Sequence, residues 1–356
     1  STLQDVNDHA GLSVPTIVNQ IKTSKTPPTY NKTNKFTVGF QTIIDAYGTA
    51  KYTEINPGLP SIVTFPFLFA VMFGDLGHGA IMTLAAAAMI YWEKPLQRGK
   101  QDELFGMAFY GRYIMLMMGI FSMYTGLIYC DVFSKELSLF PSMWEWNFPE
   151  GYDPETKQTL TATRVEGYTY PFGLDWRWHD TENDLLFSNS YKMKLSIIMG
   201  WAHMTYNLCF SYINARHFRS PIDIWGNFIP GMIFFQSIFG YLVFCIIYKW
   251  SIDWNGIGQQ PPGLLNMLIY MFLSPGTIEE ELYSGQAGVQ VVLLLLAVVQ
   301  VPILLFLKPF YLRWENNRAR AQGYRGIGEN TRVSALDDDE DEGCLLYTSP
   351  SPRDRS

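Results

Sequence analysis

Residues 224–248 read IWGNFIPGMIFFQSIFGYLVFCIIY, a run of 25 positions without Asp, Glu, Lys or Arg. A helix needs about 20 mainly apolar residues to cross the hydrocarbon core of a bilayer. Residues 282–307 form a second charge-free run, of 26 positions. Each run predicts a membrane-spanning helix, and the fold class that follows is an all-α polytopic membrane protein, a bundle of helices.

Weaker windows extend this pattern. Residues 113–130 carry no formal charge, and residues 195–215 have His203 as their titratable group besides Tyr and Cys. Both windows predict further spanning helices. Residues 261–273 are apolar but too short to span, so we expect an interfacial or re-entrant helix there.

The window at residues 61–92 allows two arrangements. Its centre reads Gly74-Asp75-Leu76-Gly77-His78-Gly79. One tilted helix would put the basic N-terminal segment on the far side of the membrane, whereas a hairpin turning at these glycines keeps it cytosolic. Each arm of the hairpin would span about 21 Å of an apolar core of about 30 Å. We favour the hairpin, which gives six crossings in this sequence.

Basic residues gather in three connections, at 93–112, 216–219 and 308–325. One crossing per window places all three on one side, which the positive-inside rule makes cytosolic. The connection 131–189 has eleven carboxylates against four Lys and Arg, and it falls on the opposite, lumenal side with 249–281. Its many Trp and Tyr rings predict either anchoring among lipid headgroups or a small packed cap.

Four regions follow along the chain. Residues 1–60 are mixed polar sequence, interpreted as the end of a cytosolic N-terminal domain and its lead-in. Residues 61–308 are the transmembrane bundle, and residues 309–343 are a cytosolic linker that changes from basic to acidic. Residues 344–356 back-translate to a string that resembles a transposase sequencing adapter, so we expect the native sequence to be lost after about Gly343.

Composition argues against several functions. The net charge is −7 and the chain has no basic stripe, so nucleic acid is not an expected partner. The four cysteines include no CxxC pair, which argues against a disulfide framework or a zinc site. No phosphate loop, GxGxxG, HExxH or Ser/His/Asp arrangement stands out. We therefore expect no catalytic residue, no metal and no cofactor in this chain.

Polar groups inside membrane helices are expensive and need a reason. Asp75, with His78 one turn on, is either a proton-relay carboxylate or a cap on the second helix of the hairpin. His203 either carries protons or bonds a neighbouring helix. Lys194 either snorkels to the interface or points inward at a carboxylate, and Gln236 either binds water or joins helices. These five residues are our candidates for a proton path.

Three consecutive carboxylates, Glu279, Glu280 and Glu281, follow the short apolar segment. They could ring the lumenal mouth of an exit path, or they could form a solvated edge at the interface.

Specific strings carry a family resemblance. They are TPPTY at 26–30, FPFLFAVMFGDLGHG at 65–79, GIFSMYTG at 119–126, DVFSK at 131–135, FSNSYKMKLS at 187–196 and FLSPGTI at 272–278. Together they resemble subunit a, the 116 kDa-type membrane subunit of the eukaryotic vacuolar-type proton-translocating ATPase. The resemblance runs from about residue 15 to about residue 315.

The resemblance implies a bundle of eight membrane helices, six of them within this sequence. It implies a stator of the V0 sector that holds two proton half-channels against a rotating proteolipid c-ring, while other, soluble subunits hydrolyse ATP. The implied partners are the c-ring, other V0 subunits, membrane lipids and, through the missing N-terminal domain, the V1 peripheral stalk. The implied location is the membrane of the vacuole, lysosome, endosome or Golgi.

The sequence departs from this family in one respect. The essential arginine of the family lies on the helix after the acidic linker, which this sequence does not reach, so we expect the fragment not to pump. Two other classes compete. A stand-alone proton-coupled secondary transporter often shows inverted repeats, and we find none. A membrane-embedded enzyme would need clustered metal ligands, and the five histidines are scattered.

Overall fold

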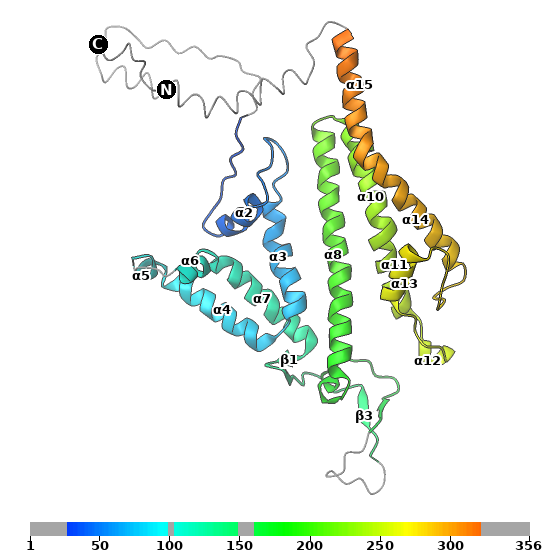
Figure 1. The fold of residues 1–356 in the computed structure, drawn as a ribbon. Coiled ribbons are helices and arrows are strands. Elements are labelled where there is room, and N and C mark those ends of the chain that lie inside the picture. The colour runs from blue at the N-terminus through cyan, green and yellow to red at the C-terminus, as the bar shows by residue number, and fades with distance from the viewer. Residues whose placement is uncertain (1–26, 99–102, 149–159, 322–356) are drawn as a thin grey trace. The chain divides into compact units, whose positions relative to one another are not determined.

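The structure is a computed structural model that describes residues 27–98, 103–148 and 160–321. The predicted adapter segment, 344–356, and most of the predicted linker lie outside these residues. The chain divides into a short unit ending at Gly58 and a large unit beginning at Leu59. Most described residues are helical (Figure 1), so the helical part of the predicted fold class is confirmed.

The short unit contains helix α2 (Thr37–Asp45), whose Phe40 is 1% exposed. Gln41 on this helix donates to Asp45 Oδ1 and accepts from Asn56. None of the predicted site residues belongs to this unit.

The window at 61–92 forms two helices, α3 (Gly58–Phe73) and α4 (Leu76–Tyr91). In Figure 1, α4 turns back from the end of α3 instead of continuing it, as the hairpin prediction requires. Each helix has 16 residues, about 24 Å at a rise of 1.5 Å per residue. The break at residues 74 and 75 therefore leaves two arms that are short for a full crossing.

Helix α4 leads through α5 (Glu93–Arg98) and α6 (Glu103–Tyr110) to α7 (Arg112–Tyr129). The axes of α6 and α7 differ by 64°. At this bend the buried Arg112 donates to Glu93 at 3.2 Å and to the carbonyl of Phe109 at 2.9 Å. Arg112 therefore holds the bend between α6 and α7. It is also one of the basic residues that predict a cytosolic location for the connection 93–112.

The predicted lumenal loop contains two short antiparallel strand pairs. Strands β1 (Asp131–Val132) and β2 (Lys135–Glu136) form the first, and β3 (Trp144–Trp146) and β4 (Ala162–Arg164) form the second. The 3₁₀ helix η1 (Trp176–Asp180) follows. The strands are an exception to the all-α prediction. Trp144 and Trp178 of this loop contact each other, as a packed cap requires, and anchoring among lipid headgroups stays a prediction.

Helix α8 (Asp184–His217) runs unbroken for 34 residues. After it, α9 (Pro221–Asp223), η2 (Ile224–Phe228), α10 (Ile229–Phe235), η3 (Gln236–Gly240) and α11 (Tyr241–Ser251) form one continuous helix in which η2 and η3 are π-helical. Such wide turns are rare inside α-helices and recur at functional sites.

The last described elements begin with α12 (Trp254–Ile257) and α13 (Leu264–Leu273). Then α14 (Gln286–Pro302), the π segment η4 (Ile303–Leu307) and α15 (Lys308–Ala321) follow without interruption. A short helix at 261–273 is confirmed by α13.

By length and apolar composition, two described helices can cross a membrane, Pro221–Ser251 and Gln286–Arg318. The bent pair α6–α7 makes a third candidate if it counts as one span. The two arms of the hairpin are shorter apolar helices. Helix α8 is not among the candidates, because polar side chains such as His203 and Asn207 lower its mean hydropathy. The predicted count of six crossings is not confirmed.

Candidate functional site

Asp75 stands in the break between α3 and α4, where both of its oxygens accept hydrogen bonds. Oδ1 accepts from the backbone N–H groups of Gly77 (2.7 Å), His78 (3.1 Å) and Phe133 (3.2 Å). Oδ2 lies 2.8 Å from Nδ1 of His78. Asp75 is therefore the N-cap of α4, and it also joins this helix to the loop that follows α7. A proton-relay role for Asp75 stays a prediction.

The glycines around Asp75 serve close packing. None of Gly74, Gly77 and Gly79 has a positive φ, so the turn between α3 and α4 does not use the left-handed conformation that glycine allows. A Cβ on Gly77 would lie 2.5 Å from the Phe133 ring, and one on Gly79 would lie 2.9 Å from the backbone N of Met123. Small residues let α4 and α7 approach backbone to backbone, as in many membrane helix pairs.

A second carboxylate, Asp131, lies beside this turn at the start of β1. Its Oδ1 is buried without a hydrogen-bond partner among the described residues. Burial raises the pKa of Asp131 and the Asp75 carboxylate raises it further, against the opposing effects of His179, Lys192 and the Ser134 N–H. Asp131 is not among the predicted site residues, although it directly follows the charge-free window at 113–130.

Gln236 joins the continuous helix after α9 to α8. Its Oε1 accepts from Nε1 of Trp201 at 2.9 Å, and its Nε2 donates to Oγ1 of Thr205 at 3.0 Å. Trp201 and Thr205 are four residues apart and share one face of α8. Gln236 also begins the π segment η3. Its contacts are those of a residue that holds two helices together.

The structure does not bring the remaining α8 candidates to Gln236. His203 lies two residues from Trp201, about 200° around the helix, and it is half-buried. The Nζ of Lys194 lies 5.8 Å from the ring centroid of Trp250 on α11, a cation–π contact. Lys194 therefore faces an aromatic ring, and its pairing with a carboxylate stays a prediction.

The predicted mouth carboxylates Glu279 and Glu280 line a cavity of about 80 Å³. A water needs roughly 10–15 Å³ of such space, so several waters fit. Gln286 and Gln290 from α14 line the same cavity and are 1% and 3% exposed. The cavity therefore connects solvent-exposed carboxylates with buried amides.

Beyond the cavity the polar contacts continue inward. Nε2 of Gln290 donates to the hydroxyl of Tyr241 at 3.4 Å, and that hydroxyl lies 3.0 Å from the hydroxyl of Tyr283. Gln286 accepts from the backbone N–H of Leu282, while its Nε2 is buried without a partner in the described part of the chain. An unpaired buried donor beside a cavity is a site for water.

Gln286 and Gln290 are not among the predicted site residues, although the amide Gln236 is, because they lie near one end of their apolar window and not at its centre. The signal was available, since Gln286 and Gln290 are spaced by four residues at the start of the window 282–307 and so share one helix face. The third mouth candidate, Glu281, does not line the cavity.

Apolar helices of spanning length, joined through buried polar clusters, define a helical membrane protein. Comparison with known sequences gives the family. Residues 1–349 match the V-type ATPase 116kDa subunit family, and the chain belongs to that family.

Curated relatives cover most of the chain. It is 73% identical to V-type proton ATPase subunit a of Neurospora crassa, over 96% of this chain and 40% of that protein. It is 58% identical to the vacuolar isoform of Saccharomyces cerevisiae, over 86% of this chain and 36% of that protein. It is 45% identical to the V-type proton ATPase 116 kDa subunit a 1 of Mus musculus, over 96% of this chain and 42% of that protein. The chain thus spans about two fifths of its relatives.

Proposed function

We propose that this chain is the membrane stator part of subunit a in the V0 sector of a vacuolar-type ATPase, and that it helps to form the proton half-channels against the c-ring. The observation that carries the proposal is the cavity between Glu279, Glu280 and the buried amides Gln286 and Gln290. Carboxylates at the mouth attract protons, and water on buried amides provides a hydrogen-bonded route into an apolar bundle.

The proposed topology has six crossings: α3, α4, α7, α8, the helix Pro221–Ser251 and the helix Gln286–Arg318. It keeps the loop 131–189 and the cavity on the lumenal side. The arginine-bearing helix of the whole subunit would separate proton entry from exit, because a cation beside a ring carboxylate lowers the pKa of that carboxylate. The path in this chain is one portion of the complete route.

Proton transport in the assembled ATPase, carrying full-length subunit a, tests this role. Glu279→Gln combined with Glu280→Gln, or Gln290→Leu alone, should lower ATP-driven proton transport at least threefold while the complex still assembles. Glu281→Gln is the matched control because Glu281 does not line the cavity. If the two cavity variants transport protons as fast as the Glu281→Gln control, the cavity is not part of the proton path.

The alternative, a stand-alone proton-coupled secondary transporter, makes a different prediction. Such a protein would move protons after purification without a proteolipid ring. We expect full-length subunit a to co-purify with the ring and to transport protons only in its presence.

A further inference from the structure

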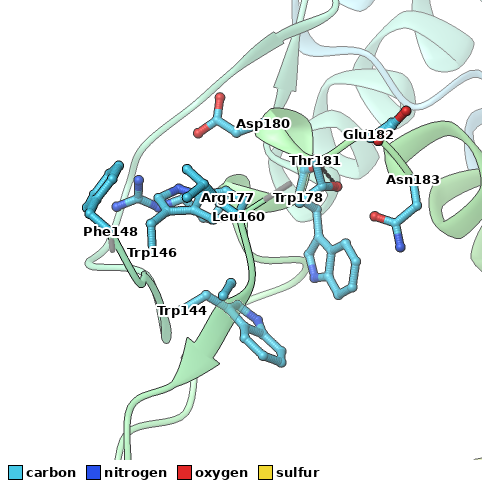
Figure 2. A pocket seen from close by; sticks show the side chains of 11 residues that line it. Trp144, Trp146, Phe148, Leu160, Arg177, Trp178, Asp180, Thr181, Glu182 and Asn183 are labelled. Atoms are coloured by element: carbon cyan, nitrogen blue, oxygen red, sulfur yellow. Dashed lines mark hydrogen bonds between the residues drawn. The ribbon is translucent and has the colours of Figure 1, made fainter. Parts of the chain in front are cut away.

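A separate pocket of about 820 Å³ lies in the loop between α7 and α8. Strand β3, strand β4, η1 and the three residues between η1 and α8 contribute to its described walls (Figure 2). Its volume is in the range of small-molecule sites, about 300–1,000 Å³. The pocket is separate from the proton-path candidates, none of which lines it.

Buried contacts hold the pocket in shape. Asp175 is 4% exposed, and its carboxylate accepts from Ser142 Oγ and Met143 N–H, each at 2.8 Å, and from Arg177 N–H at 3.0 Å. These bonds tie the segment before β3 to η1. Trp178 of η1 stacks on Phe187 of α8 with ring centroids 4.0 Å apart. These contacts therefore hold two of the pocket walls, the start of β3 and η1, in a fixed position.

The lining combines flat aromatic faces with hydrogen-bonding groups. Trp144 and Trp178 meet edge to face, with ring centroids 6.1 Å apart and ring planes at 72° (Figure 2). Phe187 covers one face of Trp178. The rings of Trp144, Trp146 and Phe148 are therefore the ones left for a ligand. Phe148, which is 62% exposed, also lines the pocket. Asp180 and Asn183 are exposed and contribute polar groups to the same lining. Aromatic faces take the C–H faces of sugar rings, while carboxylate and amide groups bind hydroxyls, which both donate and accept.

The distance from the membrane argues against a lipid headgroup. If α8 enters the hydrocarbon at residue 195, as its charge-free window indicates, Asn183 lies about 18 Å further out along the helix. A tilt of 40° reduces this to about 14 Å. The headgroup region is only about 5–7 Å deep on each side. The pocket therefore opens beyond the headgroups, into the aqueous lumen.

We propose that this pocket binds a neutral oligosaccharide carried by a glycoprotein on the lumenal side. Neutral sugar fits better than an acidic one, since the carboxylates of Asp180 and Glu182 outnumber the guanidinium of Arg177 in the lining. An extended peptide would also meet aromatic rings, but its single N–H per residue matches a polar lining less well than the hydroxyls of each sugar ring. The membrane-distance step rests on the proposed crossing by α8, whereas sugar binding itself does not.

The test uses the assembled ATPase with full-length subunit a in nanodiscs, treated with endoglycosidase to clear the pocket. Fluorescence polarisation of a labelled high-mannose oligosaccharide should give saturable binding. Phe148→Ala should weaken it at least tenfold. Phe172→Ala is the matched control, because Phe172 is also exposed (42%) in the same loop and lies outside the lining. Asn183→Ala provides a second pocket variant that removes no ring.

Several outcomes would overturn the proposal. The first is the absence of saturable binding at oligosaccharide concentrations up to about 10 mM, above the range of weak binding. The second is an equal effect of Phe148→Ala and Phe172→Ala. The third is displacement by a proline-rich peptide or by phosphocholine but not by free mannose oligosaccharide. Because binding is measured apart from proton transport, a failure here leaves the stator role untouched.

Discussion

Replacing Asp75 by Asn and by Ala separates its capping role from any role of its charge. Three of its four hydrogen bonds end on Oδ1, which an asparagine retains. Asn and Asp are about equally good N-caps. The fourth bond joins Oδ2 to His78, and an Asn amide can donate to a neutral imidazole at the same place. Asp75→Asn should therefore fold and assemble as the wild type does.

Asp75→Ala removes both acceptor oxygens and with them all four hydrogen bonds. Loss of the cap costs about 1 kcal/mol. The N–H of Phe133, which lies outside the cap, also loses its acceptor, which costs about 1–3 kcal/mol where it is buried. The sum is about 2–4 kcal/mol. The His78 side chain is 54% exposed, so its ion pair with Asp75 adds little, and His78→Ala serves as the control for that contact alone.

Thermal melting of the assembled membrane complex, followed by release of subunit a, measures these differences. The melting temperature should fall in the order wild type, Asp75→Asn, Asp75→Ala, with the second step at least about three times the first. If Asn destabilises as much as Ala, the capping argument is wrong. If Asp75→Asn assembles normally but loses proton transport more than tenfold, the carboxylate has a role in the proton path that the cap does not explain.

Three further predictions concern neighbouring contacts. Gly126→Ala on α7 would place a Cβ 2.6 Å from the carbonyl carbon of Asp75 and should destabilise the complex by about 1–3 kcal/mol in the same melting assay, while Gly200→Ala, with nothing within 4 Å, should be neutral. Asp131→Asn should raise the melting temperature at pH 7.5. The pKa of Asp131 is raised above 3.8 in the folded protein, so its carboxyl stabilises the fold below pH 3.8 and loses this contribution as it ionises at higher pH. The gain from Asn should therefore vanish near pH 4, and an equal gain at pH 7.5 and pH 4 would contradict this reasoning. Gln236→Leu should cost about 1 kcal/mol, because interhelical hydrogen bonds in membranes average about 0.6 kcal/mol each, and unchanged melting would show that Trp201 and Thr205 find other partners.

The sequence predicted where the helices lie better than how they are wound. The charge-free run 224–248 falls within the helix Pro221–Ser251, and 282–307 falls within Gln286–Arg318. The π segments could not be predicted, because a wide turn depends on neighbours distant in sequence. At Gly240, for example, a Cβ would lie 2.5 Å from Oε1 of Gln236, whose own position is set by residues of α8.

Glycines show the same limit. The sequence reveals that Gly77 has no Cβ but not that a Phe ring from 56 positions further along the chain occupies the space. The glycines predict the turn, a local feature, but not the close packing, which depends on residues distant in sequence. The string FPFLFAVMFGDLGHG carries the family resemblance without revealing which contacts this segment makes.

Unused hydrogen-bonding capacity is the property that separates the candidates for a proton path. A group whose donors and acceptors are all engaged by fixed backbone or side-chain partners must break a bond before it can pass a proton. Asp75 accepts four such bonds, and Gln236 bonds both Trp201 and Thr205. Glu279 and Glu280, by contrast, are exposed at a cavity that several waters fit. Glu279 also bonds the side chain of Tyr270, which leaves the rest of its carboxylate open to water.

Gln286 completes this contrast, because its buried Nε2 has no partner among the described residues. Gln286 and Gln290 are both buried and lie on the same face of α14. Leaving such a donor dry costs about 1–3 kcal/mol, so water in the cavity is favoured there before any proton moves. The water that bonds the Nε2 of Gln286 would therefore also form part of the proton route. For this reason the cavity between α13 and α14, more than the charged turn at Asp75, is where substitutions should separate proton transport from assembly.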